Sequence, residues 1–478
     1  MANKKSPLLL KAEAAEKKRR FNIPKKGRIR IILILTVLGI LIAALTGNNE
    51  KSSVEVNGDK EIKENAPDTY ENKKVGQKKE KEERDKRKKQ DQGLLKTVIN
   101  KITPERKLDL NSEKLRTIFR EKEFPLNRKV AKFRYKGKRL QAHSTIDTAS
   151  VKRSQRYFRR YHPRYGAAVL LEIETGRILA LASYTRDDAP FIHDKLFAKS
   201  LFPAASVFKT ITAAGVIEKA GYTPDTQLKV SGGNHTLYQW QLEKELKNHT
   251  TVSLEKAFAY SINPALGRIG LYDLKPNGLR EYALKFGFNS EVPFLFPGSK
   301  SRFEYPGENL ECAEIASGFN QSTTLSPLLG ALIAGSIANN GNMMQPVLID
   351  SITDSEHNNV YNLQPRLWRM PIDSSSADKV KRIMSAVTSY GTAQKGFKYI
   401  KRSSRFSDIE HGGKTGSVDK DNYGRVDWFI GFARHTTDKD QRVAVGVVTV
   451  HGDYWTVHSS YLGAEIMRHY IRSRQDMS

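Results

Sequence analysis

Cysteine is nearly absent from this chain of 478 residues, which contains only Cys312. A single thiol excludes an internal disulfide and any zinc site built from several cysteines. We expect Cys312 to be a small core residue, because the surrounding sequence offers no histidine partner for a catalytic role. The histidines show no metal-ligand spacing either, so we expect neither a metal site nor a cofactor. The histidines considered are His193, His235, His249 and His411.

Acidic side chains are also scarce, at 52 against 80 Lys and Arg, which gives a formal net charge of +28. The deficit is uneven along the chain. Residues 1–30 hold 11 basic and 2 acidic side chains and residues 94–165 hold 21 and 6, whereas residues 166–478 hold 35 and 32. A nucleic-acid enzyme would be expected to carry its basic surface on the domain that does the chemistry. The nearly neutral C-terminal region therefore argues against nucleic acid as a partner.

Long uncharged apolar runs are rare, and the one at residues 31–46 follows a basic stretch. A helix of that length rises about 24 Å, short of a hydrocarbon core of about 30 Å, and flanking side chains can snorkel to close the gap. We predict an uncleaved transmembrane anchor. A cleaved signal peptide is the alternative, although residues 1–30 form a long preamble for one. The positive-inside rule then predicts a cytoplasmic tail at residues 1–30 and an extracytoplasmic location after the anchor.

Two segments with little apolar patterning separate this run from the C-terminal region. Residues 47–93 mix charges of both signs and are predicted to be a disordered linker that provides reach, with a solvated single helix as the alternative. Residues 94–165 are predicted to form a small basic membrane-proximal module. Its surface is either a solvated basic face or a contact for anionic lipid headgroups or cell-wall polyanions, and we favour the solvated face.

The C-terminal region, residues 166–474, begins and ends with strand patterns and has helical patterns between them. The expected strands cover residues 167–173, 178–183, 412–418, 428–433 and 443–450. A buried helix is expected from about residue 204 to 219, and a last helix over residues 461–472. This order predicts an α+β fold, in which one antiparallel sheet is flanked by helices and carries an all-helical subdomain.

The candidate chemistry lies in three short motifs, of which the first is Ser206-Val207-Phe208-Lys209 at the start of the buried helix. Spacing i, i+3 puts the serine hydroxyl and the lysine amine on one helical face, within hydrogen-bonding reach. Apolar neighbours would desolvate Lys209 and lower its pKa, so that a neutral amine can accept the serine proton. A serine in the first helical turn also exposes its backbone N–H, which suits a developing oxyanion.

Further S-x-x-K spacings make the first motif weak on its own. Two of them join Ser253 to Lys256 and Ser376 to Lys379. We interpret both serines as helix N-caps that are followed by solvated lysines. Other motifs are therefore needed to identify the nucleophile.

The second and third motifs supply that specificity. Ser261-Ile262-Asn263 is the only S-x-N in the chain, and Lys414-Thr415-Gly416 is the only K-T-G. The ordered set of three motifs is far more specific than any one of them. His411 lies three residues before Lys414 and is a candidate for lining the same cleft.

The ordered set resembles that of the serine penicillin-recognising enzymes, and the likeness extends over most of residues 140–472. It is closest to the transpeptidase domain of class B penicillin-binding proteins. Four further stretches share this likeness: Ser144-Thr145-Ile146-Asp147, Thr175 to Ala180, Gly391-Thr392-Ala393 and Asp427 to Phe432. The resemblance implies a single-pass peptidoglycan D,D-transpeptidase of the bacterial cell (inner) membrane. Its substrates would be stem peptides on the extracytoplasmic side, β-lactams would inhibit it covalently, and a cell-wall polymerase would be a possible partner.

The resemblance also implies a role for each catalytic candidate. Ser206 would attack the D-Ala-D-Ala carbonyl and form an acyl-enzyme, with Lys209 as the acylation base. Ser261 and Lys414 would relay the proton to the leaving D-alanine, and Asn263 would orient Lys209 and the substrate amide. An amine of a neighbouring stem peptide would then take the acyl group and form a cross-link.

Substrate binding is implied for the K-T-G strand. Thr415 and Ser417, on either side of Gly416, would hold the substrate carboxylate, and the N–H groups of Ser206 and Ser417 would form the oxyanion hole. Ser417 stands where the family usually has threonine, but it keeps the hydroxyl. The family's Gly-Gln-Gly is replaced by the stretch 317–321, Ser-Gly-Phe-Asn-Gln.

Several alternatives remain open. A class A β-lactamase needs the E-x-x-L-N carboxylate, which is absent, and the nearest match is the stretch 281–285. Class D enzymes usually carry valine in place of Asn263, and the space before Ser144 is too short for the glycosyltransferase of a bifunctional protein. A D,D-carboxypeptidase uses the same triad. The intact triad argues against a silent scaffold, and residues 1–30 contain no recognisable output domain for an antibiotic sensor.

Overall fold

The computed structural model describes residues 86, 110–121, 124–307, 309–420 and 423–477. The expected cytoplasmic tail, the anchor at residues 31–46 and all but one residue of the expected linker lie outside these ranges. Within them, the structure has no helix that combines the length and apolarity needed to cross a membrane. The described residues from 110 onward belong to one compact unit.

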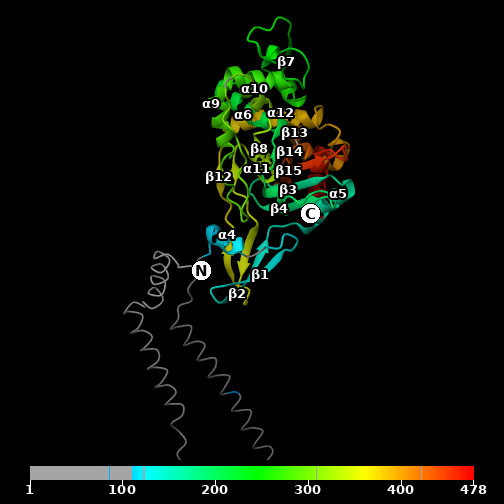
Figure 1. The fold of residues 1–478 in the computed structure, drawn as a ribbon. Coiled ribbons are helices and arrows are strands. Elements are labelled where there is room, and N and C mark those ends of the chain that lie inside the picture. Colours follow the sequence, from blue (N-terminus) through cyan, green and yellow to red (C-terminus); the bar gives the residue numbers. More distant parts are fainter. Residues whose placement is uncertain (1–85, 87–109, 122–123, 308, 421–422, 478) are drawn as a thin grey trace, which may run out of the picture. The chain divides into compact units, whose positions relative to one another are not determined.

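A five-stranded antiparallel sheet forms the centre of this unit, in the order β13-β14-β15-β3-β4 (Figure 1). The strands are β3 (Tyr165–Glu172), β4 (Ile178–Thr185), β13 (Ile409–Lys420), β14 (Gly424–His435) and β15 (Arg442–His451). β15 pairs with β3, which joins the last strand of the region to the first. The predicted antiparallel sheet, built from both ends of the region, is therefore confirmed.

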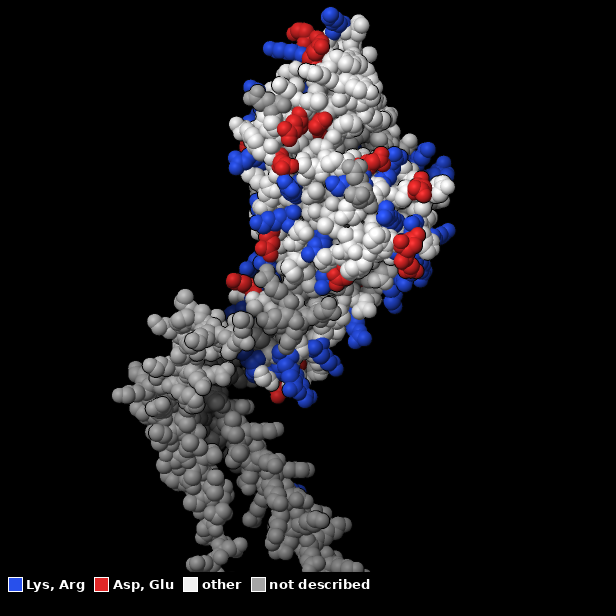
Figure 2. Space-filling model, viewed as in Figure 1, with Lys and Arg blue, Asp and Glu red and all other residues white. Residues whose placement is uncertain are grey.

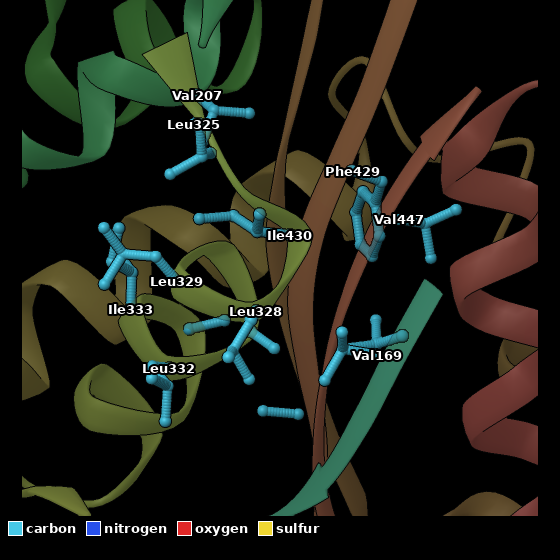
Figure 3. Packing of buried hydrophobic residues seen from close by; sticks show 14 of the residues in the cluster. Val169, Val207, Leu325, Leu328, Leu329, Leu332, Ile333, Phe429, Ile430 and Val447 are labelled. Carbon is cyan, nitrogen blue, oxygen red and sulfur yellow. The ribbon is translucent and has the colours of Figure 1, made fainter. Parts of the chain in front are cut away.

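Helices cover both faces of this sheet. Helix α11 (Pro327–Ala338) is buried throughout and packs on β14, β15 and β3. Helices α5 (Thr148–Tyr161) and α14 (Ser459–Gln475) pack against each other, α5 on β4 and α14 on β14 and β15. Figure 3 shows that neighbouring side chains of β14 point to opposite faces of the sheet. Ile430 points toward α11, and Phe429 points away from α11 and lies beside Val447. Because both faces are covered, the central strands β3 and β15 read in the sequence as nearly continuous apolar runs.

The helical subdomain is arranged around α6 (Lys209–Ala220). Its other helices are α7 (Leu254–Ala259), α8 (Asn263–Arg268), α9 (Lys275–Lys285), α10 (Leu310–Ser317) and α12 (Ser374–Ser389), with the short α13 (Lys398–Lys401) beyond. Helix α6 is buried on nearly every side and ends at Gly221, whose φ of 71° is left-handed. The helix expected from residue 204 to 219 is confirmed, although its first turn, Ala205–Phe208, is a 3₁₀ turn.

Short strand pairs connect the helical elements. β5 (Phe202–Pro203) pairs with β8 (Thr324–Leu325), β6 (Gln227–Val230) with β7 (Thr250–Ser253), and β9 (Met343–Met344) with β12 (Leu367–Arg369). Cys312 is fully buried on α10, as expected for a small core residue, and its thiol donates to the Gly270 carbonyl at 3.3 Å.

The two serines interpreted as N-caps behave differently. Ser253 caps α7, with its hydroxyl accepting from the Lys256 N–H at 3.2 Å. Ser376 does not cap α12; that interpretation was wrong. Asp373 is the N-cap, and its carboxylate accepts from the Ser376 N–H at 2.7 Å. A carboxylate three residues earlier in the chain takes the position because it can satisfy the same first-turn donor.

The described part of the basic stretch 94–165 shares elements with the region after it. Helix α4 (Ser112–Glu121) is followed by the hairpin of β1 (Val130–Tyr135) and β2 (Lys138–Ser144), and β2 pairs with β10 (Ile349–Thr353), which pairs with β11 (Asn359–Asn362). Contacts of β2 and α5 thus cross the boundary expected at residue 165. Figure 2 shows blue side chains gathered at the hairpin end, where Lys132, Arg134, Lys138 and Arg139 are exposed.

Candidate active site

The three motifs meet at one cavity although they come from three separate elements. Ser206 lies on the 3₁₀ turn before α6, and the K-T-G motif lies on β13. Ser261 lies between α7 and α8, and Asn263 is the first residue of α8. The cavity has a volume of about 310 Å³. Its lining residues are Ser206, His235, Ser261, Asn263, Gly318, Phe319, Thr392, Thr415, Gly416, Ser417, Asp427, Trp455, His458 and Ser460. Lys209 and Lys414 are fully buried and bond to Ser206 and Ser261 of this wall.

The Lys209 amine is 0% exposed and touches three oxygens. It lies 2.8 Å from Ser206 Oγ, 2.7 Å from Asn263 Oδ1 and 2.5 Å from the Ser317 carbonyl oxygen. Burial, followed by the charge of Lys414, holds the pKa of Lys209 well below its usual range. A neutral amine has two N–H donors and one lone pair, and the amide and carbonyl oxygens can only accept. When the Lys209 amine is neutral, the Asn263 and Ser317 oxygens take both of its donors, and the lone pair is left for the Ser206 hydroxyl proton.

The Lys414 amine forms a second, separate relay. It donates to Ser261 Oγ at 3.0 Å and to the Thr415 carbonyl at 2.8 Å, and it lies 5.5 Å from the centre of the Phe258 ring. Burial lowers the pKa of Lys414 to about 7. An amine that titrates near neutrality can both give and take a proton at little cost. Ser261 and Lys414 together can therefore carry a proton to a leaving group.

The S-x-N turn is held in an unusual backbone conformation. Ser261 has a φ of 58°, which is left-handed and disfavoured for a residue with a Cβ. Asn263 fixes the turn through its Nδ2, which donates to the His235 carbonyl at 3.0 Å, and through its N–H, which donates to the Asn234 carbonyl at 2.7 Å. Strained backbone that its surroundings hold in place is common at functional sites. Here it turns the Ser261 hydroxyl toward Lys414.

Two glycines allow neighbouring segments to approach the backbone of the nucleophile turn, residues 205–208, very closely. A Cβ on Gly318, whose φ is 68°, would lie 2.0 Å from the Ala205 carbonyl oxygen and 2.8 Å from the Ser206 nitrogen. A Cβ on Gly416 would lie 3.1 Å from the same nitrogen. The end of α10 and strand β13 therefore both pack closely against the backbone of the nucleophile turn. The Gly-Gln-Gly replacement at residues 317–321 keeps a glycine at the tight contact.

Gly318→Ala should lower the rate of acylation by a penicillin more than tenfold and should lower the unfolding temperature. The new methyl group meets backbone atoms that cannot rotate away, and alanine adds about 1–2 kcal/mol of strain at a left-handed φ. Thermal unfolding and the acylation rate measure the two effects. Gly452→Ala is the matched control, because its added Cβ meets nothing within 4 Å and its φ is not left-handed. Equal behaviour of the two variants would contradict the close contact.

The K-T-G strand presents hydroxyls at an edge of the main sheet. β13 is the terminal strand in the sheet order, and Thr415 Oγ1 lies 2.6 Å from Thr392 Oγ1. Thr415 and Ser417 are two residues apart on an extended strand, so their side chains point to the same face. The structure thus places two hydroxyls side by side at the cavity, where a carboxylate can accept from both.

Some residues of the site had no signal in the sequence. Ser317 contributes its backbone carbonyl oxygen, which leaves no signature in the sequence. Trp455 and His458 also line the cavity, and they come from the loop between β15 and α14. His411 does not line the cavity, contrary to expectation. Its Nδ1 lies 2.8 Å from Thr388 Oγ1. Four residues of extended strand, about 13 Å, separate it from Thr415, so proximity in sequence to the motif did not bring it to the cleft.

A comparison with protein families agrees with this geometry. The family described as penicillin binding protein transpeptidase domain matches residues 166–471, which is more than half of the chain. The chain belongs to this family. The match covers the helical subdomain and the five-stranded sheet. The matched range contains all three motifs that meet at the cavity.

Relatives and solved structures extend the likeness. The chain is 27% identical over 321 residues to the peptidoglycan D,D-transpeptidase PbpA of Mycolicibacterium smegmatis, covering 61% of this chain and 62% of that protein. The D,D-transpeptidase domain of a peptidoglycan glycosyltransferase from Eggerthella lenta has a TM-score of 0.57 at 23% identity, covering 70% of this chain and 84% of that one. Penicillin-binding protein A of M. tuberculosis, solved as an imipenem acyl-enzyme, has a TM-score of 0.56 at 24% identity, covering 68% and 78%. These structures confirm the predicted α+β fold.

Proposed function

We propose that the protein is a serine D,D-transpeptidase that cross-links peptidoglycan stem peptides and is acylated by β-lactams. The contact between Lys209 Nζ and Ser206 Oγ, at 2.8 Å within a buried cluster of neutral acceptors, carries this proposal. It places a buried amine, whose pKa is lowered by burial, beside the serine hydroxyl, so that the amine can act as the base that acyl transfer requires. The PbpA relative is named as a D,D-transpeptidase, which supports the same chemistry.

Acylation uses the first relay. Ser206 Oγ bonds to the carbonyl carbon of the penultimate D-alanine, and the hydroxyl proton moves to Lys209 Nζ. The N–H groups of Ser206 and Ser417 stabilise the oxyanion. The C–N bond to the terminal D-alanine then breaks, and the leaving nitrogen takes a proton through Ser261 and Lys414.

Deacylation uses the same groups in reverse. The amine of a second stem peptide bonds to the acyl carbon and loses a proton to the relay as the ester bond to Ser206 breaks. During the preceding acylation step, Thr415 and Ser417 hold the terminal carboxylate of the donor peptide, which then leaves with the released D-alanine. The narrow contact at Gly416 lets β13 approach the nucleophile turn. A β-lactam carbonyl follows the first half of this sequence and leaves the acyl group on Ser206.

The N-terminal assignments form part of the same proposal. Residues 1–30 would be the cytoplasmic tail, residues 31–46 the anchor in the bacterial cell membrane, and residues 47–93 the linker to the extracytoplasmic catalytic region. The uncharged run behind a basic stretch supports this topology. The resemblance to class B proteins suggests a cell-wall polymerase as a partner.

Product analysis tests the reaction. With a pentapeptide donor and an acceptor amine, the full-length chain should release one D-alanine for each cross-linked product, and Ser206→Ala should give neither. Release of D-alanine with only hydrolysed tetrapeptide, unchanged by the acceptor, would instead identify a carboxypeptidase. A fluorescent penicillin that is hydrolysed rapidly would identify a β-lactamase, and a chain that never becomes labelled would identify a scaffold.

A further inference from the structure

Asp427 is a buried carboxyl group that lines the cavity and has no role in the mechanism above. It is 5% exposed. It lies on β14 directly opposite Ser417 of β13. Residues opposite each other in an antiparallel pair share a face of the sheet, with Cβ atoms about 4.5–5.5 Å apart. Asp427 is therefore the immediate neighbour of a hydroxyl that is proposed to hold the terminal carboxylate of the donor peptide.

The Asp427 side chain is fixed at the cavity wall. The Ser459 N–H, in the first turn of α14, donates to its Oδ2 at 2.5 Å, and the Trp455 side chain also bonds to the carboxyl group. The Ser459 hydroxyl donates to the Asp427 backbone carbonyl at 2.8 Å. A carboxyl group held by these contacts cannot turn away when a ligand carboxylate enters.

The elements around Asp427 bring no cation to pair with it. On β15, Thr449 lies opposite Asp427, and burial lowers the pKa of His451 to about 4. Before α14, burial and the charge of Lys395 lower the pKa of His458. Arg425, two residues away on the same face, is bonded to Asp419 of β13 at 2.8 Å.

The protonation state follows from this environment. Among the described residues, Asp427 takes part in no ion pair, and burial raises its pKa to about 7 despite the bonds from Ser459 and Trp455. At that value the neutral fraction falls from about nine tenths at pH 6 to about one tenth at pH 8. A neutral carboxyl group can donate a hydrogen bond to an anion, whereas an ionised one repels it.

We propose that protonated Asp427 donates its O–H to the ligand carboxylate held by Thr415 and Ser417, and that Asp427 thereby sets the specificity of this subsite. This inference rests on the proposed function, because it takes the terminal carboxylate of the donor peptide as the ligand group. Ligands with a free terminal carboxylate bind more tightly below neutral pH, and ligands with a C-terminal amide show no such dependence.

Binding without acylation tests this inference. The full-length chain with Ser206→Ala is titrated with diacetyl-L-Lys-D-Ala-D-Ala and with its C-terminal amide between pH 6 and pH 8. We expect the Kd of the acid peptide to weaken roughly tenfold as the neutral fraction of Asp427 falls, and the Kd of the amide to stay constant. Adding Asp427→Asn should keep the acid peptide tightly bound and its Kd constant across this range.

Controls separate Asp427 from other groups. Asp419→Asn removes an exposed carboxylate from the same face of β13 and should leave the tenfold change intact. Lys414 also titrates near pH 7, so a tenfold change that persists in the Asp427→Asn chain would assign the effect to Lys414 and overturn the inference. Equal pH dependence for acid and amide peptides would overturn it even if Asp427→Asn fails to fold. Absence of binding by either peptide at every pH would overturn the proposed substrate as well.

Discussion

Ser206→Ala should abolish covalent labelling of the full-length chain by a fluorescent penicillin, with a loss in acylation rate of at least about 10⁴-fold. The acyl group bonds to Ser206 Oγ, and Lys209 lies beside this hydroxyl, whereas the hydroxyl of Ser261 is bonded to Lys414 instead. Labelling followed in time by gel fluorescence measures the rate. Ser206 is half-buried, and its replacement removes one atom, so thermal unfolding should stay close to that of the parent.

The chain itself provides the control for this substitution. Ser253 begins the second S-x-x-K spacing and caps α7, so Ser253→Ala removes the same atom outside the cavity at a cost of about 1 kcal/mol. It should be labelled as fast as the parent. If Ser206→Ala is also labelled at the parent rate, another residue is the nucleophile and the proposed site is wrong.

Lys209→Met should lower the acylation rate by about 10²–10⁴-fold, which is the usual contribution of a positioned general base. Methionine fills a similar volume but offers no lone pair to the Ser206 proton. It also leaves the Ser317 carbonyl and Asn263 Oδ1 without a donor, so some loss of stability is expected as well. The second-order rate constant for acylation measures the first effect, and thermal unfolding measures the second.

Lys256→Met is the matched control for the base. Lys256 holds the corresponding position in the second S-x-x-K spacing, but its side chain is exposed. The variant should be acylated at the parent rate. A Lys209→Met chain that is acylated within threefold of the parent would show that another group, such as Lys414, takes the serine proton.

The sheet and the central helix could be predicted because they leave local patterns. Strands buried on both faces read as apolar runs, and α6 reads as a helix that is apolar nearly all round and ends at Gly221. The three motifs could be ordered because K-T-G and S-x-N each occur once. Composition alone, however, placed a boundary at residue 165 that β2 and α5 cross by pairing and packing, since long-range strand partners leave no mark on composition.

The remainder of the site depends on tertiary neighbours. Ser317 contributes a backbone oxygen, which any residue type could supply. The role of Asp427 could be recognised only once its pairing with Ser417 was known, because the register of β13 against β14 decides which residues lie opposite each other. The N-cap of α12 was assigned to Ser376 instead of Asp373 for a local reason. Several residues near the start of this helix can act as an N-cap, and the sequence does not show at which of them the helix begins.

The pairing of β15 with β3 has a consequence for how the enzyme is made. The nucleophile turn and α6 are synthesised well before β13, β14 and β15, and the sheet that holds Lys414 closes only when the last strands reach β3. Contacts between such distant parts of a chain form late in folding. A partly synthesised chain therefore has Ser206 but no second lysine beside it. The second relay, from Lys414 through Ser261, therefore assembles only after nearly the whole polypeptide has been made.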